Sequence, residues 1–369
     1  MDNSRLFKPT KLGAITLQHR VGMCPLTRFR ASAEHVPTPS MVEYYEQRGS
    51  VPGTLLVTEG TFISAAHGGY NLVPGIWNTE QIAAWRRVTD AVHRKGSYIF
   101  CQLWALGRTA DPAVLARSGS QLRSSSSVPM SGEGRTTPLA MTADEIQEAI
   151  DEYAAAAKKA IDAGFDGIEL HGANGYLIDQ FIQDVCNKRT DEWGGSVENR
   201  SRFAVEVTKA VSEAIGPDRV GIRLSPWSTF QDMRMADPVP QFSDILTKLN
   251  PLNIAYVHVV EARVSGNADI EVSESLDFVY GIRKQLLLVA GGYSPASAKK
   301  LVDEDHPDRD IVVMFGRHFI SNPDLPFRIQ HGISLHPYDR KTFYNPNDVE
   351  GYTGQPFSEE FLESTKTSA

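Results

Sequence analysis

The chain has 369 residues, of which 41% are hydrophobic and 22% charged, and its formal net charge is -8. These fractions are those of an ordinary soluble protein, and the length exceeds that of the usual small domain. The acidic balance and the lack of a Lys/Arg-rich run exclude the phosphate-binding stripe of a nucleic-acid-binding protein. No apolar leader follows Met1 and no stretch reaches membrane-spanning length, so we expect no membrane contact. Three cysteines without a Cys-x-x-Cys pair indicate a reducing, cytoplasmic location.

Short β-rich runs recur along the chain, and most are apolar throughout. The runs are 21–24, 54–58, 98–102, 167–170, 220–224, 256–260, 287–290 and 311–315. Strands that are buried on both faces have this composition, as in a parallel sheet covered by helices.

Helical segments lie between these runs. Thr142 with Glu145, and Asn78 with Gln81, form capping boxes that predict two helix starts. A third helix is indicated by apolar residues at helical spacing within 203–214. Eight strand–helix alternations predict an α/β fold, a (β/α)8 TIM barrel with an N-terminal extension. A doubly wound sheet is the second choice, because no Gly-x-Gly-x-x-Gly follows an early strand.

Two polar segments interrupt the alternation, 107–139 and 261–277. We expect both to be long capping loops over the mouth of the barrel, after the third and sixth strands. No linker or repeat divides the chain, so residues 1–369 are predicted to form one domain.

The run from Glu169 to Leu177 carries the clearest functional signal. His171, Asn174 and Tyr176 follow a buried strand at a turn with two glycines. Each residue taken singly is more often structural, but the set suits holding a carbonyl oxygen while a proton is delivered nearby.

Other strand ends suggest a bound cofactor. The glycines at 291, 292 and 316, followed by Arg317, favour a phosphate site, which barrels commonly place there. Thr27 and Gln102 add neutral polar groups, and Arg223 adds a positive charge beneath them. A flat, polar heterocycle tethered by phosphate fits this set, and flavin mononucleotide (FMN) meets that description.

Over nearly its whole length the chain resembles the Old Yellow Enzyme family of FMN-dependent ene-reductases. The segments that carry the resemblance are 6–9, 20–30, 69–71, 74–77, 100–104, 171–181, 191–200 and 315–325. Residues 50–54 and 105–108 are similar to fungal members of secondary metabolism, such as chanoclavine-I aldehyde reductases.

The resemblance implies a role for each site residue. It implies that His171 and Asn174 bind the substrate carbonyl oxygen and that Tyr176 protonates the alkene. The implied FMN contacts are Pro25, Leu26, Thr27, Gly60, Gln102, His171, Arg223, Gly291, Gly292, Gly316 and Arg317. The implied pocket residues are Tyr70, Trp104, Phe230, Phe278 and Tyr344, for all of which core or rim packing is the alternative. No metal is expected, because neither His-x-His nor His-Glu-x-x-His occurs.

The implied reaction is reduction of an enone or enal by NADPH or NADH in ping-pong order, by a monomer or homodimer. One alternative is an alkene isomerase/reductase of an ergot-alkaloid-like pathway, although Tyr176 favours net reduction. Another is a non-flavin phosphate-binding barrel, an isomerase or aldolase. Against it, no lysine stands at a predicted strand end.

Overall fold

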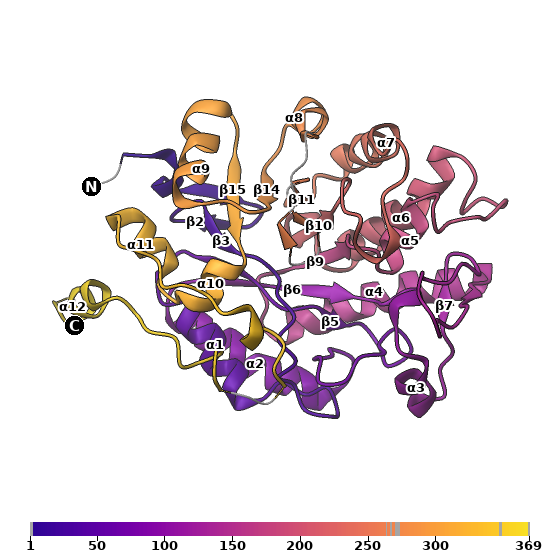
Figure 1. Cartoon of the computed structure of the whole chain (residues 1–369), viewed down its shortest axis with the longest axis horizontal. Helices are drawn as coiled ribbons and strands as arrows, with labels where there is room; N and C mark the ends of the chain where they lie inside the picture. Colours follow the sequence, from indigo (N-terminus) through magenta and orange to yellow (C-terminus); the bar gives the residue numbers. More distant parts are fainter. Residues whose placement is uncertain (1–2, 263, 266–267, 270–273, 347–348, 368–369) are drawn as a thin grey trace.

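Parallel strands close into a barrel at the centre of the computed structural model, with helices outside (Figure 1). The structure describes residues 3–262, 264–265, 268–269, 274–346 and 349–367. The barrel strands are β3 (Val21–Met23), β4 (Leu55–Val57), β6 (Tyr98–Trp104), β9 (Gly167–Gly172), β10 (Val220–Leu224), β11 (Tyr256–Val260), β14 (Leu287–Ala290) and β15 (Ile311–Phe315). Their order is β4-β3-β15-β14-β11-β10-β9-β6, and β6 pairs with β4 to complete the ring. The predicted (β/α)8 barrel is confirmed, and every predicted run coincides with a strand.

Helices follow the strands and cover the barrel. The covering helices are α1 (Pro39–Arg48), α2 (Thr79–Arg94), α4 (Ala143–Asp162), α6 (Val197–Ile215), α7 (Val239–Leu249), α8 (Asp277–Ile282), α9 (Pro295–Lys300) and α11 (Leu325–His331). Further elements are α3 (Pro112–Leu115), α5 (Leu177–Ile182), α10 (Arg317–Ser321), α12 (Glu359–Thr367), β5 (Thr61–Phe62), β7 (Arg123–Ser124), β8 (Leu139–Ala140), β12 (Val264–Ser265) and β13 (Ala268–Asp269). Both predicted capping boxes are present, at the starts of α2 and α4.

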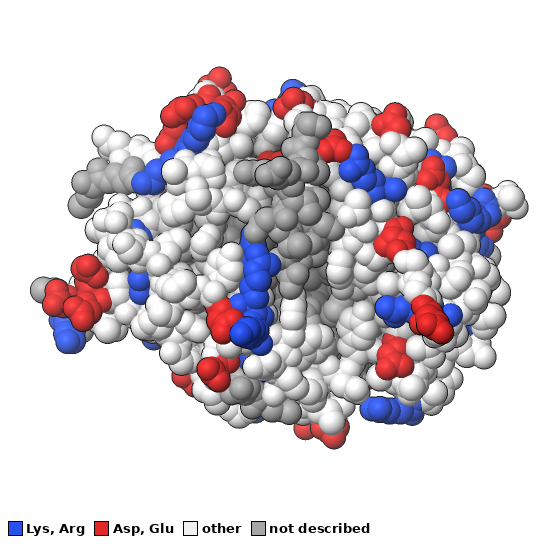
Figure 2. All heavy atoms as spheres, viewed as in Figure 1, with Lys and Arg blue, Asp and Glu red and all other residues white. Residues whose placement is uncertain are grey.

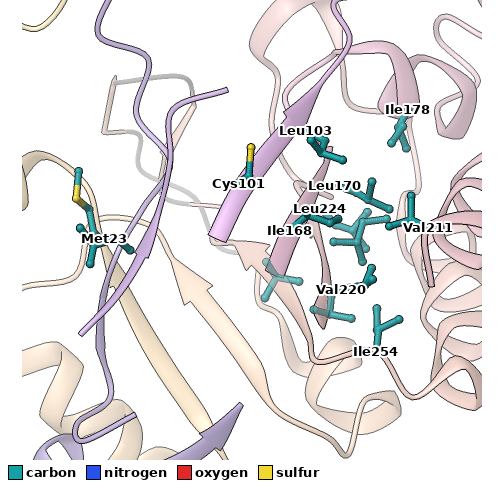
Figure 3. Packing of buried hydrophobic residues seen from close by; sticks show 14 of the residues in the cluster. Met23, Cys101, Leu103, Ile168, Leu170, Ile178, Val211, Val220, Leu224 and Ile254 are labelled. Atoms are coloured by element: carbon teal, nitrogen blue, oxygen red, sulfur yellow. The ribbon is translucent and has the colours of Figure 1, made fainter. Parts of the chain in front are cut away.

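The outer layer of the core lies between strands and helices. Ile168 and Leu170 of β9 and Leu224 of β10 are buried with Val211 of α6 in the same cluster, as Figure 3 shows. Because side chains alternate along a strand, Glu169 and His171 of β9 face the inside of the barrel instead. This alternation gives the barrel an apolar outside for the helices and leaves polar groups at its centre.

The N-terminal extension closes the amino end of the barrel. It forms a hairpin of β1 (Thr10–Leu12) and β2 (Ile15–Leu17). The backbone of this segment bonds to Asp218, just before β10, and to Gly53, just before β4. The hairpin therefore covers the amino ends of these strands and leaves their carboxyl ends uncovered by this segment.

The inside of the barrel is tightly filled at Gly221. A Cβ added there would lie 2.2 Å from Cζ of Tyr256, its partner on β11. We expect Gly221→Ala to lower the free energy of unfolding by about 1–3 kcal/mol, measured by denaturant titration. Gly281→Ala in α8 is the control, because nothing lies within 4 Å of an added Cβ there. Equal stability of Gly221→Ala and the parent chain would contradict this packing.

The segment 107–139 lies against α5. The hydroxyls of Ser124 and Ser125 donate to the side-chain and backbone oxygens of Gln180, at 2.8 and 2.7 Å. The second predicted capping loop, 261–277, lies partly outside the described residues.

None of the described helices is long and apolar enough to cross a membrane. On the face shown in Figure 2, the described Lys/Arg and Asp/Glu side chains are interspersed in small groups. Other residue types make up most of this surface.

Candidate active site

A cavity of about 520 Å³ lies at the carboxyl ends of the barrel strands. This volume falls within the usual range of cofactor and small-molecule sites, about 300–1,000 Å³. The sequence-predicted residues that line it are Pro25, Leu26, Thr27, Tyr70, Gln102, Trp104, His171, Asn174, Tyr176, Arg223, Phe230, Gly291, Gly292, Gly316, Arg317 and Tyr344. The fold thus brings together side chains from both ends of the sequence.

Two predicted residues lie outside this lining. Gly60 lies against Trp104, and an added Cβ would be 2.3 Å from Cε3 of that ring. Its missing side chain therefore lets Trp104 occupy the cavity wall. Phe278 is half-buried on α8, where it packs against the core and meets Trp227 edge-on at 6.1 Å. The role of Phe278 in the substrate pocket stays a prediction.

The turn from β9 to α5 presents three polar side chains to the cavity. Asn174 has a left-handed backbone (φ 59), which Asn tolerates better than most residues, and its N–H donates to Oγ of Ser225 at 2.8 Å. Tyr176 is the residue before α5, and its ring centroid lies 4.8 Å from that of His171 and 4.7 Å from that of Trp104. The local turn therefore fixes the phenol of Tyr176 beside the imidazole of His171.

Burial sets the protonation of both rings. Burial, and then the positive charge of Arg223, lower the pKa of His171 well below 6.5, so the imidazole is neutral at neutral pH. Burial, and then Tyr70, raise the pKa of Tyr176, so its phenol keeps its proton. The site offers a neutral donor and a protonated acid side by side.

A buried polar network lies behind Gln102 and Arg223, which line the cavity. Glu169, fully buried, accepts hydrogen bonds from Nε2 of Gln102 at 2.9 Å and from His258 at 2.8 Å. Arg223 stands between His171 and His258 in strand register. Burial raises the pKa of Glu169, but His258, Arg223 and Gln102 outweigh it, so this carboxylate is ionised. Burial lowers the pKa of His258, so the negative charge of Glu169 balances Arg223.

The sequence alone does not predict Glu169 and His258 as site residues. The available signal is the polar side chain inside an otherwise apolar strand, Glu169 between Ile168 and Leu170 and His258 between Val257 and Val259. Polar residues in buried strands need partners, and Glu169 of β9 and His258 of β11, on either side of β10, are each other's partner.

The far end of the cavity suits a phosphate. Gly291 and Gly292 directly follow β14, and Gly316 directly precedes α10, which begins at Arg317. These glycines have no side chain to cover their backbone amides. Backbone amides and a guanidinium together bind phosphate oxygens. No cluster of three His, Cys, Asp or Glu side chains within the described ranges is arranged to hold a metal ion.

The residues present fit FMN. Nε of Arg223 and Nδ1 of His171 are buried without a hydrogen-bond partner among the described residues, and both side chains line the cavity. A flavin ring has the polar edge that such atoms require, and its phosphate matches the glycine-rich end. The cavity therefore offers complementary groups at both ends of this cofactor.

Comparison with known proteins agrees with this geometry. Residues 5–336 match the model of the NADH:flavin oxidoreductase / NADH oxidase family. The chain is 55% identical to the chanoclavine-I aldehyde reductase fgaOx3 of Penicillium roqueforti, over 99% of this chain and 100% of that protein. It is 51% identical to the NADP-dependent oxidoreductase lnbE of Aspergillus flavus, over 98% of each.

A solved structure shows the same fold. The Old Yellow Enzyme from Pichia sp. AKU4542 superposes with a TM-score of 0.90 at 39% identity, covering 97% of this chain and 94% of that one. The chain therefore belongs to the NADH:flavin oxidoreductase / NADH oxidase family and is an FMN-dependent NAD(P)H oxidoreductase of the Old Yellow Enzyme type.

Proposed function

We propose that this chain reduces the activated C=C bond of α,β-unsaturated carbonyl compounds in ping-pong order, using NADPH or NADH. The observation that carries the proposal is the convergence of a neutral His171, Asn174 and a protonated Tyr176 on one cavity. Neutral donors suit a carbonyl oxygen, which becomes an enolate oxygen during the reaction. Membership of a flavin family leaves no role for the non-flavin isomerase or aldolase that a barrel alone allows.

Each side chain has one task in this reaction. His171 and Asn174 bind the carbonyl oxygen, draw electron density from the β carbon and stabilise the developing negative charge. Tyr176 gives its phenolic proton to the α carbon. FMN, when bound, supplies the redox chemistry by taking a hydride from the nicotinamide and returning one to the β carbon. Because donor and substrate use the same cavity, the oxidised nicotinamide leaves before the substrate enters.

We assign the FMN contacts as the resemblance implies. Pro25, Leu26 and Thr27 would contact the ring, and Gly60 and Gln102 would bind its pyrimidine side. His171 would complete the ring contacts, and Arg223 would set a positive charge against the bound ring. Gly291, Gly292, Gly316 and Arg317 hold the phosphate.

The substrate pocket is proposed to be shaped by Tyr70, Trp104, Phe230, Phe278 and Tyr344. Trp104 packs against Tyr70 and His171, at ring-centroid distances of 5.8 and 5.9 Å. Because a relative is named an aldehyde reductase, conjugated aldehydes are the first substrates to test. We propose that the chain works in the cytoplasm as one FMN-binding domain, as a monomer or homodimer.

Alkene isomerisation in an ergot-alkaloid-like pathway is the second candidate, in which reoxidation of the substrate returns the hydride. The retained acid Tyr176 favours net reduction, because protonation of the α carbon completes the saturated product. The two reactions differ in stoichiometry. Net reduction consumes one NADPH for each product molecule, whereas isomerisation consumes none.

Uptake of FMN tests the proposed cofactor site. Protein refolded with excess FMN and dialysed is expected to be yellow and to bind FMN saturably. Arg317→Ala is expected to weaken FMN binding by about tenfold to a hundredfold, since hydrogen bonds to charged groups contribute about 1.5–3 kcal/mol. Arg87→Ala, an exposed change on α2, is the control and keeps the parent affinity. Colourless protein without saturable uptake would overturn the proposal.

A further inference from the structure

The loop after β10 holds a strained backbone next to the cavity. Gln231 (φ 60), Asp232 (φ 59) and Arg234 (φ 83) all have left-handed conformations. Such conformations are unfavourable for residues with a Cβ and persist where the surroundings enforce them. Here Asp232 accepts the N–H and hydroxyl of Ser131 at 2.5 and 2.6 Å, and Nη2 of Arg108 donates to the Gln231 carbonyl at 3.0 Å. The conformation of Gln231 is thus enforced by two residues of the segment 107–139.

This conformation places Gln231 over the β9–α5 turn. Its Nε2 donates to the backbone oxygen of Asn174 at 2.7 Å. A Cβ added at Gly175 would lie 2.9 Å from Cβ of Gln231, so the two residues are in close contact. The N–H of Asn174 donates to Ser225, so both sides of this residue's backbone are tied to the β10 loop.

The Gln231 side chain also favours the ionised form of the Tyr176 phenol, although burial has the larger effect and raises the pKa of Tyr176. A glutamine amide carries two N–H donors, enough for one carbonyl and one phenolic oxygen. A donor at the phenol stabilises the phenolate that remains once Tyr176 has given up its proton.

We propose that Gln231 is a positioning residue that joins the carbonyl-binding group to the proton donor, because its side chain bonds the backbone of Asn174 and contacts Gly175, which directly precedes Tyr176. The inference rests on the proposed function of those two residues. The hydrogen bonds from Arg108 and Ser131 that enforce the loop conformation keep the Gln231 amide against this turn. Loss of the amide is expected to disturb carbonyl binding and proton delivery together.

Gln231→Met tests this, because methionine keeps the length of the side chain and its Cβ but has no N–H donor. Stopped-flow reduction by NADPH is expected to match the parent enzyme, whereas reoxidation by an enone is expected to slow by about tenfold, the effect of one lost hydrogen bond. Affinity for 4-nitrophenol, an enolate mimic, is expected to fall by about threefold to tenfold because Asn174 loses its support. Gln231→Glu is expected to have the same effects as Gln231→Met, because an ionised carboxylate accepts hydrogen bonds but has no N–H to donate. Gln285→Met is the control, an exposed glutamine that also donates to a backbone carbonyl.

A double-mutant cycle with Tyr176→Phe separates positioning from general disruption. In the Tyr176→Phe background Gln231→Met is expected to slow reoxidation by less than half its effect in the parent, because the shared step is already lost. Equal effects in both backgrounds, or an unchanged rate for Gln231→Met, would overturn the inference. If Tyr176→Phe alone leaves reoxidation unchanged, it is the proposed function that fails.

Discussion

Tyr176→Phe is expected to leave FMN binding and its reduction by NADPH intact and to slow reoxidation by an enone by about 10²–10⁴-fold, the usual contribution of a positioned acid. The phenol is buried and its pKa is raised, so it holds a proton at neutral pH. Phenylalanine preserves the edge-on packing against Trp104, 4.7 Å between centroids, and removes only the hydroxyl. Stopped-flow measurement follows the two half-reactions, reduction by NADPH and reoxidation by an enone, separately.

Tyr153→Phe is the matched control. Tyr153 is fully buried in α4, and its hydroxyl has no hydrogen-bond partner among the described residues. This variant removes a tyrosine hydroxyl from the core and leaves the cavity unchanged. Both half-reactions are therefore expected to keep the parent rates. Reoxidation of Tyr176→Phe at the parent rate would remove the residue from proton delivery. If the product of Tyr176→Phe shifts toward the isomerised alkene, the result agrees with proton delivery by Tyr176. Without that proton, the hydride on the substrate is transferred back and no saturated product forms.

The fold was predictable because its signals are local. Both capping boxes, at Asn78 and Thr142, depend on residues three positions apart, and both are present. Apolar runs gave the strands because strands buried on both faces need no alternation. Boundaries shifted where a strand continues into the site: β6 runs on to Trp104 and β9 to Gly172, beyond the apolar runs that predicted them.

Partners between distant strands could not be predicted in the same way. Glu169 and His258 are 89 positions apart in sequence, and their hydrogen bond depends on barrel closure. Gln231 meets Asn174 across 57 positions, through a backbone conformation that no propensity favours. Phe278 shows the converse, since an aromatic residue suits a pocket wall and a core equally and its type alone does not place it. The residues that perform chemistry were recognisable by type, whereas those that support them depend on tertiary structure.

His171→Ala is expected to lower affinity for phenols and to slow enone reduction by about 10²–10³-fold, the cost of one oxyanion donor. The neutral imidazole donates a hydrogen bond without adding a charge, so it serves a carbonyl oxygen and the enolate formed from it. Because burial lowers its pKa, His171 does not titrate near 6.5. Raising or lowering the pH through that value is therefore expected to leave the ratio of variant to parent dissociation constants for 4-nitrophenol unchanged.

The constant ratio distinguishes a neutral donor from a charged one. An imidazolium at this position would lose its charge as pH rises through 6.5, and the advantage of the parent over His171→Ala would then shrink with rising pH. Arg223, next to it in strand register, opposes that charged form. His331→Ala, exposed at the end of α11, is the control and is expected to bind 4-nitrophenol as the parent does. Unchanged phenol affinity in His171→Ala would show that the carbonyl oxygen is held by other groups of the cavity.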